Sequence, residues 1–353
     1  MRVIPPLTIT DARMTSSTVP ETAPAAYAAG TTYALNDTAY TGTVGGVLTV
    51  WKSLQAGNVG HTPSSSPTWW VEIGKVYAEY AAGVTYALKD TIQVAATHKV
   101  YESLVAGNLG NAVTDATKWL DSGSTNRWKM FDLLRNSQTT VPGTITVVLT
   151  PGARINSLAL MGLTANSVTI TVTSAFGGGQ VYSKTEDLNT RIVLDAYDYF
   201  FAPFSTQVGV VVFDIPPYSD AIITVTITAT SGSVACGGCV VGTFVYLGDV
   251  QYPPEADTLN FSTVARDSFG NSQLTPRRNV PKTTQTVWAD KSRVNRLRAV
   301  RDALNAVPAV WAGIHDDTDG YFEALFILGY YRKFSINLTH ATVAIVSLEL
   351  EEV

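Results

Sequence analysis

Cysteine is scarce in this sequence. Its 353 residues include only two cysteines, Cys236 and Cys239, in the run Ala-Cys-Gly-Gly-Cys-Val. Two cysteines exclude a disulfide scaffold for a chain of this size. A lone C-x-x-C is compatible with half of a zinc site, a redox motif or a turn, but no second pair exists and the four histidines lack metal-ligand spacing. We therefore interpret the run as a Gly-Gly hairpin and predict no metal site.

Charged residues are few, at 15% of the chain, and the formal net charge of −5 gives no general reason to expect nucleic-acid binding. One stretch is locally basic, with Asp290 as its single acid. Its cations are Arg277, Arg278, Lys282, Lys291, Arg293, Arg296, Arg298 and Arg301. Clustered cations can bind phosphates, but no recognition motif accompanies them. A solvated helix face or docking onto an acidic neighbour is the preferred interpretation, and we expect no nucleic-acid partner.

Long apolar runs are absent. No run approaches the roughly 20 residues that a membrane-spanning helix requires, so we expect no membrane insertion. Residues 1–30 have no continuous apolar segment of the kind found in secretory signals. We expect the product to be made and assembled in a cytoplasm.

Recognisable catalytic motifs are missing: there is no Gly-x-Ser-x-Gly, no His-Glu-x-x-His and no phosphate-binding loop. Two groups of aspartates remain as candidates for acid chemistry or cation binding, namely Asp195, Asp198 and Asp214, and Asp316, Asp317 and Asp319. A glycosidase pair needs a cleft that holds two carboxylates roughly 5–10 Å apart. The second group lacks the spacing and final Glu of a calcium loop. We predict polar turns, with no catalytic residues and no cofactor.

The chain is rich in Thr, Val, Ala, Gly and Tyr, a bias typical of β-structure with turns. A sequence unit occurs twice, at residues 27–74 and 80–123. Both copies read Tyr-x-x-Gly-x-x-Tyr-x-x-x-Asp, then Trp/Tyr-x-Ser-Leu-x-Ala-Gly-Asn-x-Gly, then Trp-x-x-x-Gly. The anchoring residues keep their order while the loops between them change length, which indicates a duplicated module.

We predict a mainly β chain in four parts. Residues 1–25 should form a flexible, extended N-terminal arm that pairs with a neighbour's sheet edge in an assembly. Residues 26–75 and 76–125 should each form a small three-stranded antiparallel sheet packed on its own aromatics. In the first copy, the expected strands lie at residues 32–35, 47–53 and 69–73.

Residues 126–353 predict a jelly-roll-like β-sandwich with one inserted helix. Their apolar runs alternate with period two and are separated by Gly and Pro, as expected of half-buried strands. Residues 248–310 are interpreted as an irregular excursion that carries the helix at 291–306, with Asp290 as its N-cap and Pro308 as its stop. Further strands are expected at 321–331, 333–338 and 342–350.

The aromatic residues of the repeats are the candidate functional site. Exposed Trp and Tyr rings can stack on the apolar faces of sugar rings at low entropic cost. The candidate carbohydrate-binding residues are Trp69, Trp70, Trp119, Tyr27, Tyr80, Trp51 and Tyr101. The alternative is that such small modules need aromatics as their core. The core is expected to take the inner rings, namely Tyr33, Tyr86, Trp51 and Tyr101, whereas Trp69, which has Lys118 as its counterpart, is the better candidate for exposure.

The repeated motif resembles the small chitin-binding modules of bacterial chitinases and their relatives in bacteriophage tail and fibre proteins. The order Asn126-Arg-Trp-Lys-Met-Phe-Asp132, Pro151-Gly-x-Arg-Ile-Asn156 and Gly329-Tyr-Tyr331 is similar to virion proteins of tailed phages that carry such modules before a jelly-roll domain. The resemblance implies a virion protein of the tail, in the baseplate, tail tip or fibre attachment. It implies no catalysis.

From this resemblance we expect a structural protein whose modules bind host surface polysaccharide and mediate adhesion. The expected partners are other phage tail proteins and further copies of the chain in a homo-oligomer. Two alternatives remain: a purely structural virion protein whose repeats are spacers or protein-docking modules, and, ranked last, a polysaccharide-degrading enzyme with accessory modules. The purely structural alternative predicts that the repeated aromatics are buried. The enzyme alternative requires an acidic cleft in residues 127–353.

Overall fold

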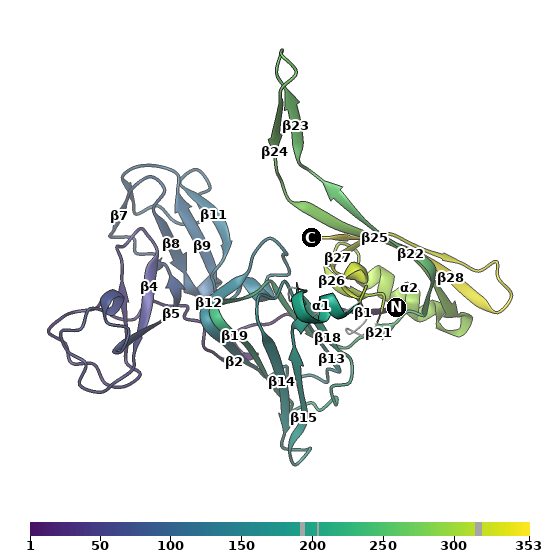
Figure 1. Cartoon of the computed structure of the whole chain (residues 1–353), viewed down its shortest axis with the longest axis horizontal. Helices are drawn as coiled ribbons and strands as arrows, with labels where there is room; N and C mark the ends of the chain where they lie inside the picture. Colours follow the sequence, from purple (N-terminus) through teal and green to yellow (C-terminus); the bar gives the residue numbers. More distant parts are fainter. Residues whose placement is uncertain (191–194, 203–204, 315–319) are drawn as a thin grey trace.

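The fold is mainly β, as the composition predicts. The structure is a computed structural model that describes residues 1–190, 195–202, 205–314 and 320–353. Figure 1 shows the two small modules together at one end of the molecule, with the larger sheets stacked beside them and one long hairpin projecting away. Among the described residues, the longest helix is α2 (Val294–Ala303), and α1 (Ala196–Phe201) is a six-residue helix.

Module 1, residues 26–75, contains the three-stranded antiparallel sheet that the sequence predicts. Its strands, in sheet order, are β3 (Thr38–Thr41), β4 (Leu48–Ser53) and β5 (Trp70–Val76). A short 3-10 helix, η1 (Pro63–Ser65), lies in the loop before β5. The predicted first strand at 32–35 is displaced, because Asn36 takes a positive φ of 72° and turns the chain before β3 begins.

Module 2, residues 76–125, has a four-stranded sheet rather than the expected three. Its strands, in sheet order, are β11 (Trp119–Ser124), β9 (Lys99–Ser103), β8 (Thr91–Val94) and β6 (Ala78–Glu79). The added strand β6 pairs with β8 in parallel. The 3-10 helix η2 (Ala95–Thr97) links β8 to β9, and β7 (Thr85–Tyr86) pairs separately with β10 (Asn108–Leu109).

The amino-terminal segment is part of the chain's own sheets, which corrects the prediction of a flexible arm. Strand β1 (Arg2–Ile4) lies between β21 (Val245–Tyr246) and β26 (Ala309–Ala312). Strand β2 (Met14–Ser17) pairs with β12 (Thr139–Leu149). The apolar residues of β1 are buried, so intrachain pairing satisfies both its backbone and its side chains.

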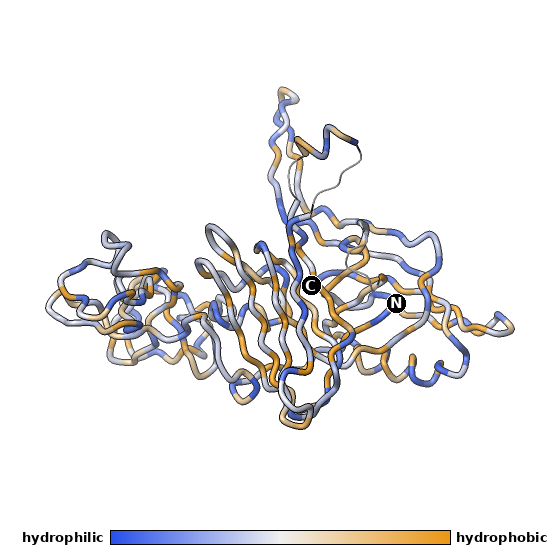
Figure 2. Tube along the Cα trace, turned by 60° about the horizontal axis from the view of Figure 1, so that its bottom comes forward, coloured by the Kyte–Doolittle hydropathy of each residue, from blue (hydrophilic) through white to orange (hydrophobic). Residues whose placement is uncertain are grey.

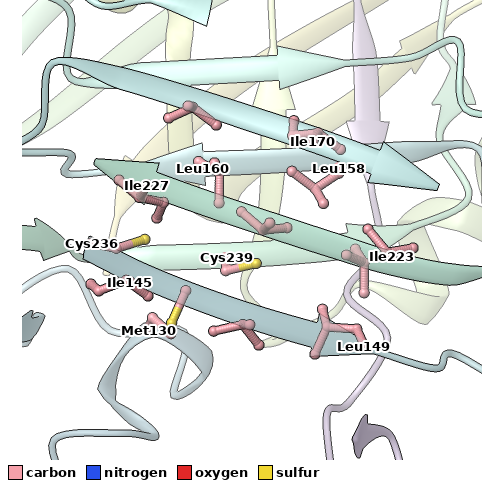
Figure 3. Close-up of a cluster of buried hydrophobic side chains, with 14 of the residues drawn as sticks. Met130, Ile145, Leu149, Leu158, Leu160, Ile170, Ile223, Ile227, Cys236 and Cys239 are labelled. Atoms are coloured by element: carbon pink, nitrogen blue, oxygen red, sulfur yellow. The ribbon is translucent and has the colours of Figure 1, made fainter. Parts of the chain in front are cut away.

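Residues 126–242 and β2 form a β-sandwich. One sheet has the order β15 (Gly179–Asp187), β14 (Ser167–Ser174), β19 (Ile222–Cys236), β12, β2. The other has the order β18 (Gly209–Val212), β13 (Ser157–Met161), β20 (Gly238–Gly242). The core between them takes the alternate apolar residues of the first sheet, and η3 (Lys129–Phe131) adds Met130 (Figure 3).

A third sheet covers the other face of β18, β13 and β20, so these strands are buried on both sides. Its strands, in order, are β21, β1, β26, β27 (Phe326–Asn337), β28 (Val343–Glu352), β25 (Asn279–Asp290) and β22 (Asp249–Asn260). Helix α2 packs on the far face of this sheet through Leu297. The described part of the body therefore has four layers, namely three sheets and a helix. The predicted sandwich accounts for two of these sheets, and the third sheet is additional.

The predicted irregular excursion is wrong for residues 249–290, which form two twelve-residue strands, β22 and β25, and a hairpin tip. The tip consists of β23 (Thr263–Arg266) and β24 (Ser272–Thr275). The helix is where the sequence predicts it. The Asp290 side chain caps η4 (Lys291–Arg293), which leads into α2, and α2 ends at Ala303, before Pro308. The remaining short elements are η5 (Glu323–Leu325), β16 (Asn189–Thr190) and β17 (Ser205–Thr206).

Glu21 joins module 2 to the sandwich. Its buried carboxylate accepts hydrogen bonds from His98 Nδ1 (2.8 Å), Thr125 Oγ1 (3.0 Å) and Trp128 Nε1 (3.1 Å). Arg127 Nη1 lies 3.4 Å from the same carboxylate. His98 and Thr125 belong to module 2, whereas Trp128 belongs to the core of the sandwich. One side chain therefore holds three segments of the chain together.

Candidate functional site in the aromatic modules

Each module is built on the same cluster of three aromatic rings. In module 1, Tyr27 stacks on Tyr33 with centroids 5.9 Å apart and planes at 17°. Trp70 meets both rings edge-on, at 6.0 and 4.9 Å. Such offset-stacked and edge-to-face arrangements are the preferred geometries of aromatic pairs.

Module 2 repeats this geometry. Tyr80 stacks on Tyr86 at 6.2 Å and 23°, and Trp119 meets them edge-on at 5.9 and 5.3 Å. The first tyrosine of the motif, its second tyrosine and its closing tryptophan are therefore packed on one another in both copies. The aromatic residues of the motif therefore form the hydrophobic core of each module.

The polar ends of the inner rings are satisfied within each module. Trp70 Nε1 donates to the His61 carbonyl at 2.8 Å, and Trp119 Nε1 donates to the Asn111 carbonyl at 3.1 Å. The Tyr33 hydroxyl accepts from the Ala28 amide at 2.9 Å. These bonds fix the rings in place and remove the cost of burying their polar atoms.

The other motif residues shape the loops. Asp37 Oδ2 accepts from the Ala34 amide at 2.7 Å, which closes the turn at the motif's first end. Asn58 Nδ2 donates to Ser53 Oγ at 3.0 Å and ties the Ala-Gly-Asn loop to β4. Module 2 forms the matching bonds with Asp90, Asn108 and Ser103. The repeated motif is therefore explained by the folding of the modules.

The structure corrects the predicted carbohydrate contacts at two positions. Trp70 and Trp119 are each only 2% exposed, so neither presents a ring face to a ligand. Their neighbours in the cores, Tyr33 and Tyr86, are also buried, as expected for inner rings. This burial is what the spacer or docking alternative expects.

The remaining candidates are half-buried and pack on the module cores. Tyr27 and Tyr80 each stack one face on the inner tyrosine. Trp51 Nε1 donates to Thr41 Oγ1 at 2.8 Å, and Tyr101 lies at the matching place in module 2. Part of each of these four rings therefore remains exposed to solvent.

Trp69 has a different environment, in that its ring stacks on His61 with centroids 4.0 Å apart and planes at 11°. Stacking covers one face of each ring, and both side chains are half-buried, so part of the stacked pair stays open to solvent. Module 2 has Lys118 and Asn111 at the matching places. Stacking on an apolar sugar face is therefore available to module 1 at a position where module 2 has no ring.

Sequence reasoning missed a second shared surface, which is aliphatic. Four apolar positions are exposed in both modules: Leu35 and Leu88, Leu54 and Leu104, Val59 and Leu109, and Val71 and Leu120. Leu54 is 40% exposed and Leu104 39%. The available signal was that all four positions are apolar in both copies: Leu54 and Leu104 belong to the motif itself, and Val59, Val71 and their counterparts adjoin motif residues.

Hydrogen bonds gather these aliphatic positions at one end of the module. The Asn36 amide donates to the Ser53 carbonyl and the Leu54 amide to the Trp69 carbonyl, each at 2.9 Å. Leu35 directly precedes Asn36 and Leu54 directly follows Ser53, so both lie at the end where β4 stops and β5 starts. The other aliphatic positions adjoin Asn58 and Trp70, which pair with the same region.

The thiols and aspartates considered in the sequence analysis lie outside the two aromatic modules. Cys236 and Cys239 are unpaired core residues, and burial raises the pKa of Cys236 to about 12 (Figure 3). Asp195 caps α1, and Asp214 accepts from the Tyr182 hydroxyl at 2.8 Å. Asp316, Asp317 and Asp319 lie outside the described residues.

Several cations of the basic stretch are paired within the chain. Arg278 contacts Glu352 at 2.7 Å, Arg301 contacts Asp302 at 2.8 Å, and Arg293 lies over the Tyr246 ring. Pairing of this kind reduces the charge that is available to a polyanion. The described part of the chain contains no group of His, Cys, Asp and Glu that would hold a metal ion.

An open cavity of about 960 Å³ lies at the edge of the third sheet. Arg2, Tyr246 and Gln251 are among its lining residues, and Asp249 is the only carboxylate among the described ones. The paired carboxylates that a glycosidase uses are therefore not found among the described residues of this cavity. No helix of the described residues has both the length and the apolar character needed to cross a membrane.

Comparison of the chain with models of known protein families gives no match, and neither does comparison with curated proteins.

Proposed function

We propose that this protein is a structural component of a bacteriophage tail, in the baseplate, tail tip or fibre attachment. Its layered β body would be held among other tail proteins, and its two modules would face the host. The observation that carries this proposal is the architecture itself: two repeated modules, each with its own aromatic core, lie in tandem at one end of a larger β body. That arrangement fits the phage proteins that the sequence resembles.

Adhesion to host-surface glycans is the activity proposed for the modules. The contact surface is narrower than the sequence predicts, because two of the seven candidate rings are in the cores. The Trp69–His61 pair of module 1 is the proposed sugar platform, with the half-buried Trp51 as a further ring of the same module. Weak stacking at one site per chain becomes strong attachment when several chains engage a surface together.

Binding of the full-length chain to host envelope and to a glycan panel tests this proposal. Trp69→Ala should weaken binding about tenfold, the equivalent of 1.4 kcal/mol. Lys118→Ala, at the matching position of module 2, is the control and should bind like the wild type. Equal binding by both variants, with folding confirmed by circular dichroism, would reject the Trp69 platform.

Protein docking is a second candidate activity for the modules, and the shared aliphatic surface favours it. The same four positions are exposed and apolar in both copies, whereas the stacked platform belongs to module 1 alone. The occupant would be an apolar surface of a neighbouring tail protein. Leu54→Lys combined with Leu104→Lys should then keep the folded protein out of assembled tails. Trp69→Ala should leave its incorporation unchanged.

A further inference from the structure

The two modules differ at one matching position of their loops, which is His61 in module 1 and Asn111 in module 2. The backbone does the same work in both, because the carbonyl of each residue accepts the indole Nε1–H of the closing tryptophan, Trp70 or Trp119. The two side chains, in contrast, make different contacts, and these contacts distinguish the two copies.

Asn111 completes the polar contacts in the core of module 2. Its Nδ2 donates to Asn108 Oδ1 at 2.8 Å, and its carbonyl also accepts from the Tyr80 hydroxyl at 2.8 Å. Asn108 and Tyr80 are residues of the repeated motif, and their counterparts in module 1 are Asn58 and Tyr27. The fold of the module can therefore satisfy both of these groups when asparagine occupies the loop position.

Module 1 leaves the same two groups without partners. The Tyr27 hydroxyl and Asn58 Oδ1 are buried, and neither atom has a hydrogen-bond partner among the described residues. The imidazole of His61 lies instead on the Trp69 ring, with centroids 4.0 Å apart and planes at 11°. Burying a polar atom without a partner lowers stability. The folding of module 1 therefore does not explain why histidine occupies this position.

The stacking contact explains the histidine, because it holds the Trp69 ring in place. This ring packs on the core of module 1 on one side and on His61 on another, while part of the stacked pair stays open to solvent. A ring that is fixed before binding loses less conformational freedom when a ligand stacks on it. Proteins give up local stability at functional sites, and the two unpaired groups of module 1 fit such a site.

The loop that carries the stacked pair has no fixed charge. The sequence contains no Asp, Glu, Lys or Arg between Lys52 and Glu72. The matching loop of module 2 contains Asp115 and Lys118. A stacking surface without fixed charge suits an uncharged sugar ring, and such binding depends little on salt.

We propose that His61 is a positioning residue for glycan binding, which fixes Trp69 as a platform for an uncharged sugar. The two copies then differ in role: module 1 binds the sugar, and module 2 joins the body through its contacts with Glu21. Figure 1 and Figure 2 show the modules at one end of the molecule in two views, as such a role requires. This inference rests on the proposed function and adds to it the role of His61 and the class of sugar.

The test measures binding of the full-length chain to an array of neutral and acidic oligosaccharides, and amide hydrogen exchange in residues 26–75. His61→Asn introduces the side chain of module 2, so the amides of module 1 should become better protected. The same variant should bind the neutral sugars about fivefold more weakly, because the Trp69 ring is no longer held. His61→Phe keeps an aromatic stack but supplies no donor, so it should bind like the wild type without the gain in protection.

Asn111→His is the matched control in module 2. It should lower amide protection in module 2, because Asn108 Oδ1 loses its donor, and it should leave sugar binding unchanged, because Lys118 offers no ring to stack on. Binding of the wild type should persist in added salt.

Trp69→Ala separates this inference from the proposed function. If Trp69→Ala binds like the wild type, or if the wild type binds no sugar, the proposed function fails and this inference fails with it. If Trp69→Ala weakens binding but His61→Asn does not, or if His61→Phe weakens it as much as His61→Asn, only the role of His61 is overturned. Unchanged protection of module 1 in His61→Asn would overturn it as well. Binding confined to acidic sugars and lost in salt would overturn the class of sugar.

Discussion

The Glu21 junction gives the sharpest test of how the parts of this molecule are held together. Glu21→Gln keeps the size of the side chain but removes its charge and replaces one acceptor oxygen with a donor. The side chain is 8% exposed, so water cannot substitute for the lost acceptor. Donors from His98, Thr125 and Trp128 then converge on a group that can no longer accept them all.

The expected cost is about 3 kcal/mol of unfolding free energy, since a hydrogen bond to a charged group contributes about 1.5–3 kcal/mol and the stranded donors remain buried. The loss of stability should arise at the contact between module 2 and the sandwich. Module 2 and the sandwich share this junction, so weakening it should separate their unfolding as well as lower the total stability.

Guanidinium unfolding, followed by tryptophan fluorescence and by circular dichroism, measures both effects. The wild type should show coincident transitions in the two signals, whereas Glu21→Gln should show an earlier phase in the total tryptophan fluorescence, to which Trp128 at the junction contributes as one of seven tryptophans. Glu102→Gln, a half-buried carboxylate on β9 of the same module, is the matched control and should fall within about 0.5 kcal/mol of the wild type. If Glu21→Gln matches that control, the junction does not couple the parts.

Three further outcomes follow from buried or paired groups. The thiols of Cys236 and Cys239 should resist Ellman's reagent in the folded protein and react after unfolding, because burial raises the pKa of Cys236 to about 12; rapid labelling of the native protein would contradict their place in the core. Trp119→Ala should cost roughly 3–5 kcal/mol and remove amide-exchange protection in module 2 but not in module 1, and a uniform loss in both would argue against separate cores. A hydrogen bond from Arg332 holds the pKa of Glu351 below its usual range, so its stabilisation is present at neutral pH and is lost as the pH falls through the folded-state pKa. The stability difference between the wild type and Arg332→Met should therefore shrink in acid, and a difference independent of pH would refute this linkage.

Structural features that depend on a local sequence pattern are predicted correctly. The period-two alternation of β12 places Ile145, Val147 and Leu149 in the core, and all three are buried. The repeat predicts two equivalent modules, and the same three-ring cluster appears in both. The Asp290 cap is likewise a local signal and is correct.

Prediction fails where the inward face of a strand is polar. Strand β25 buries Thr283 and Gln285 beside Val287 and Ala289, so its alternation is not one of apolar and polar residues. Its neighbour β22 contains two consecutive prolines, but it is the last strand of the sheet and can accept them. A polar, proline-containing stretch was therefore interpreted as irregular.

The candidate site was only partly predictable, for a related reason. Trp69 and Trp70 are adjacent, and an extended chain points neighbouring side chains to opposite sides. Composition does not say which of the two is internal. The repeat does, because the position that is aromatic in both copies is the buried one, and Trp69, which has Lys118 as its counterpart, keeps an open surface.

The pairing of the first strand with the far end of the chain has a consequence for synthesis. Val3 lies opposite Val245 on one side and Trp311 on the other, so β1 has no partner strand until about 240 further residues have been made, and its second partner strand follows only after about 300. A ribosome that adds roughly 5–20 residues per second takes about 15–60 s to deliver that partner. During this time Val3 and Ile4, both fully buried at the end, remain without their sheet. The nascent chain must therefore stay unaggregated for most of its own translation, and slower elongation lengthens this period.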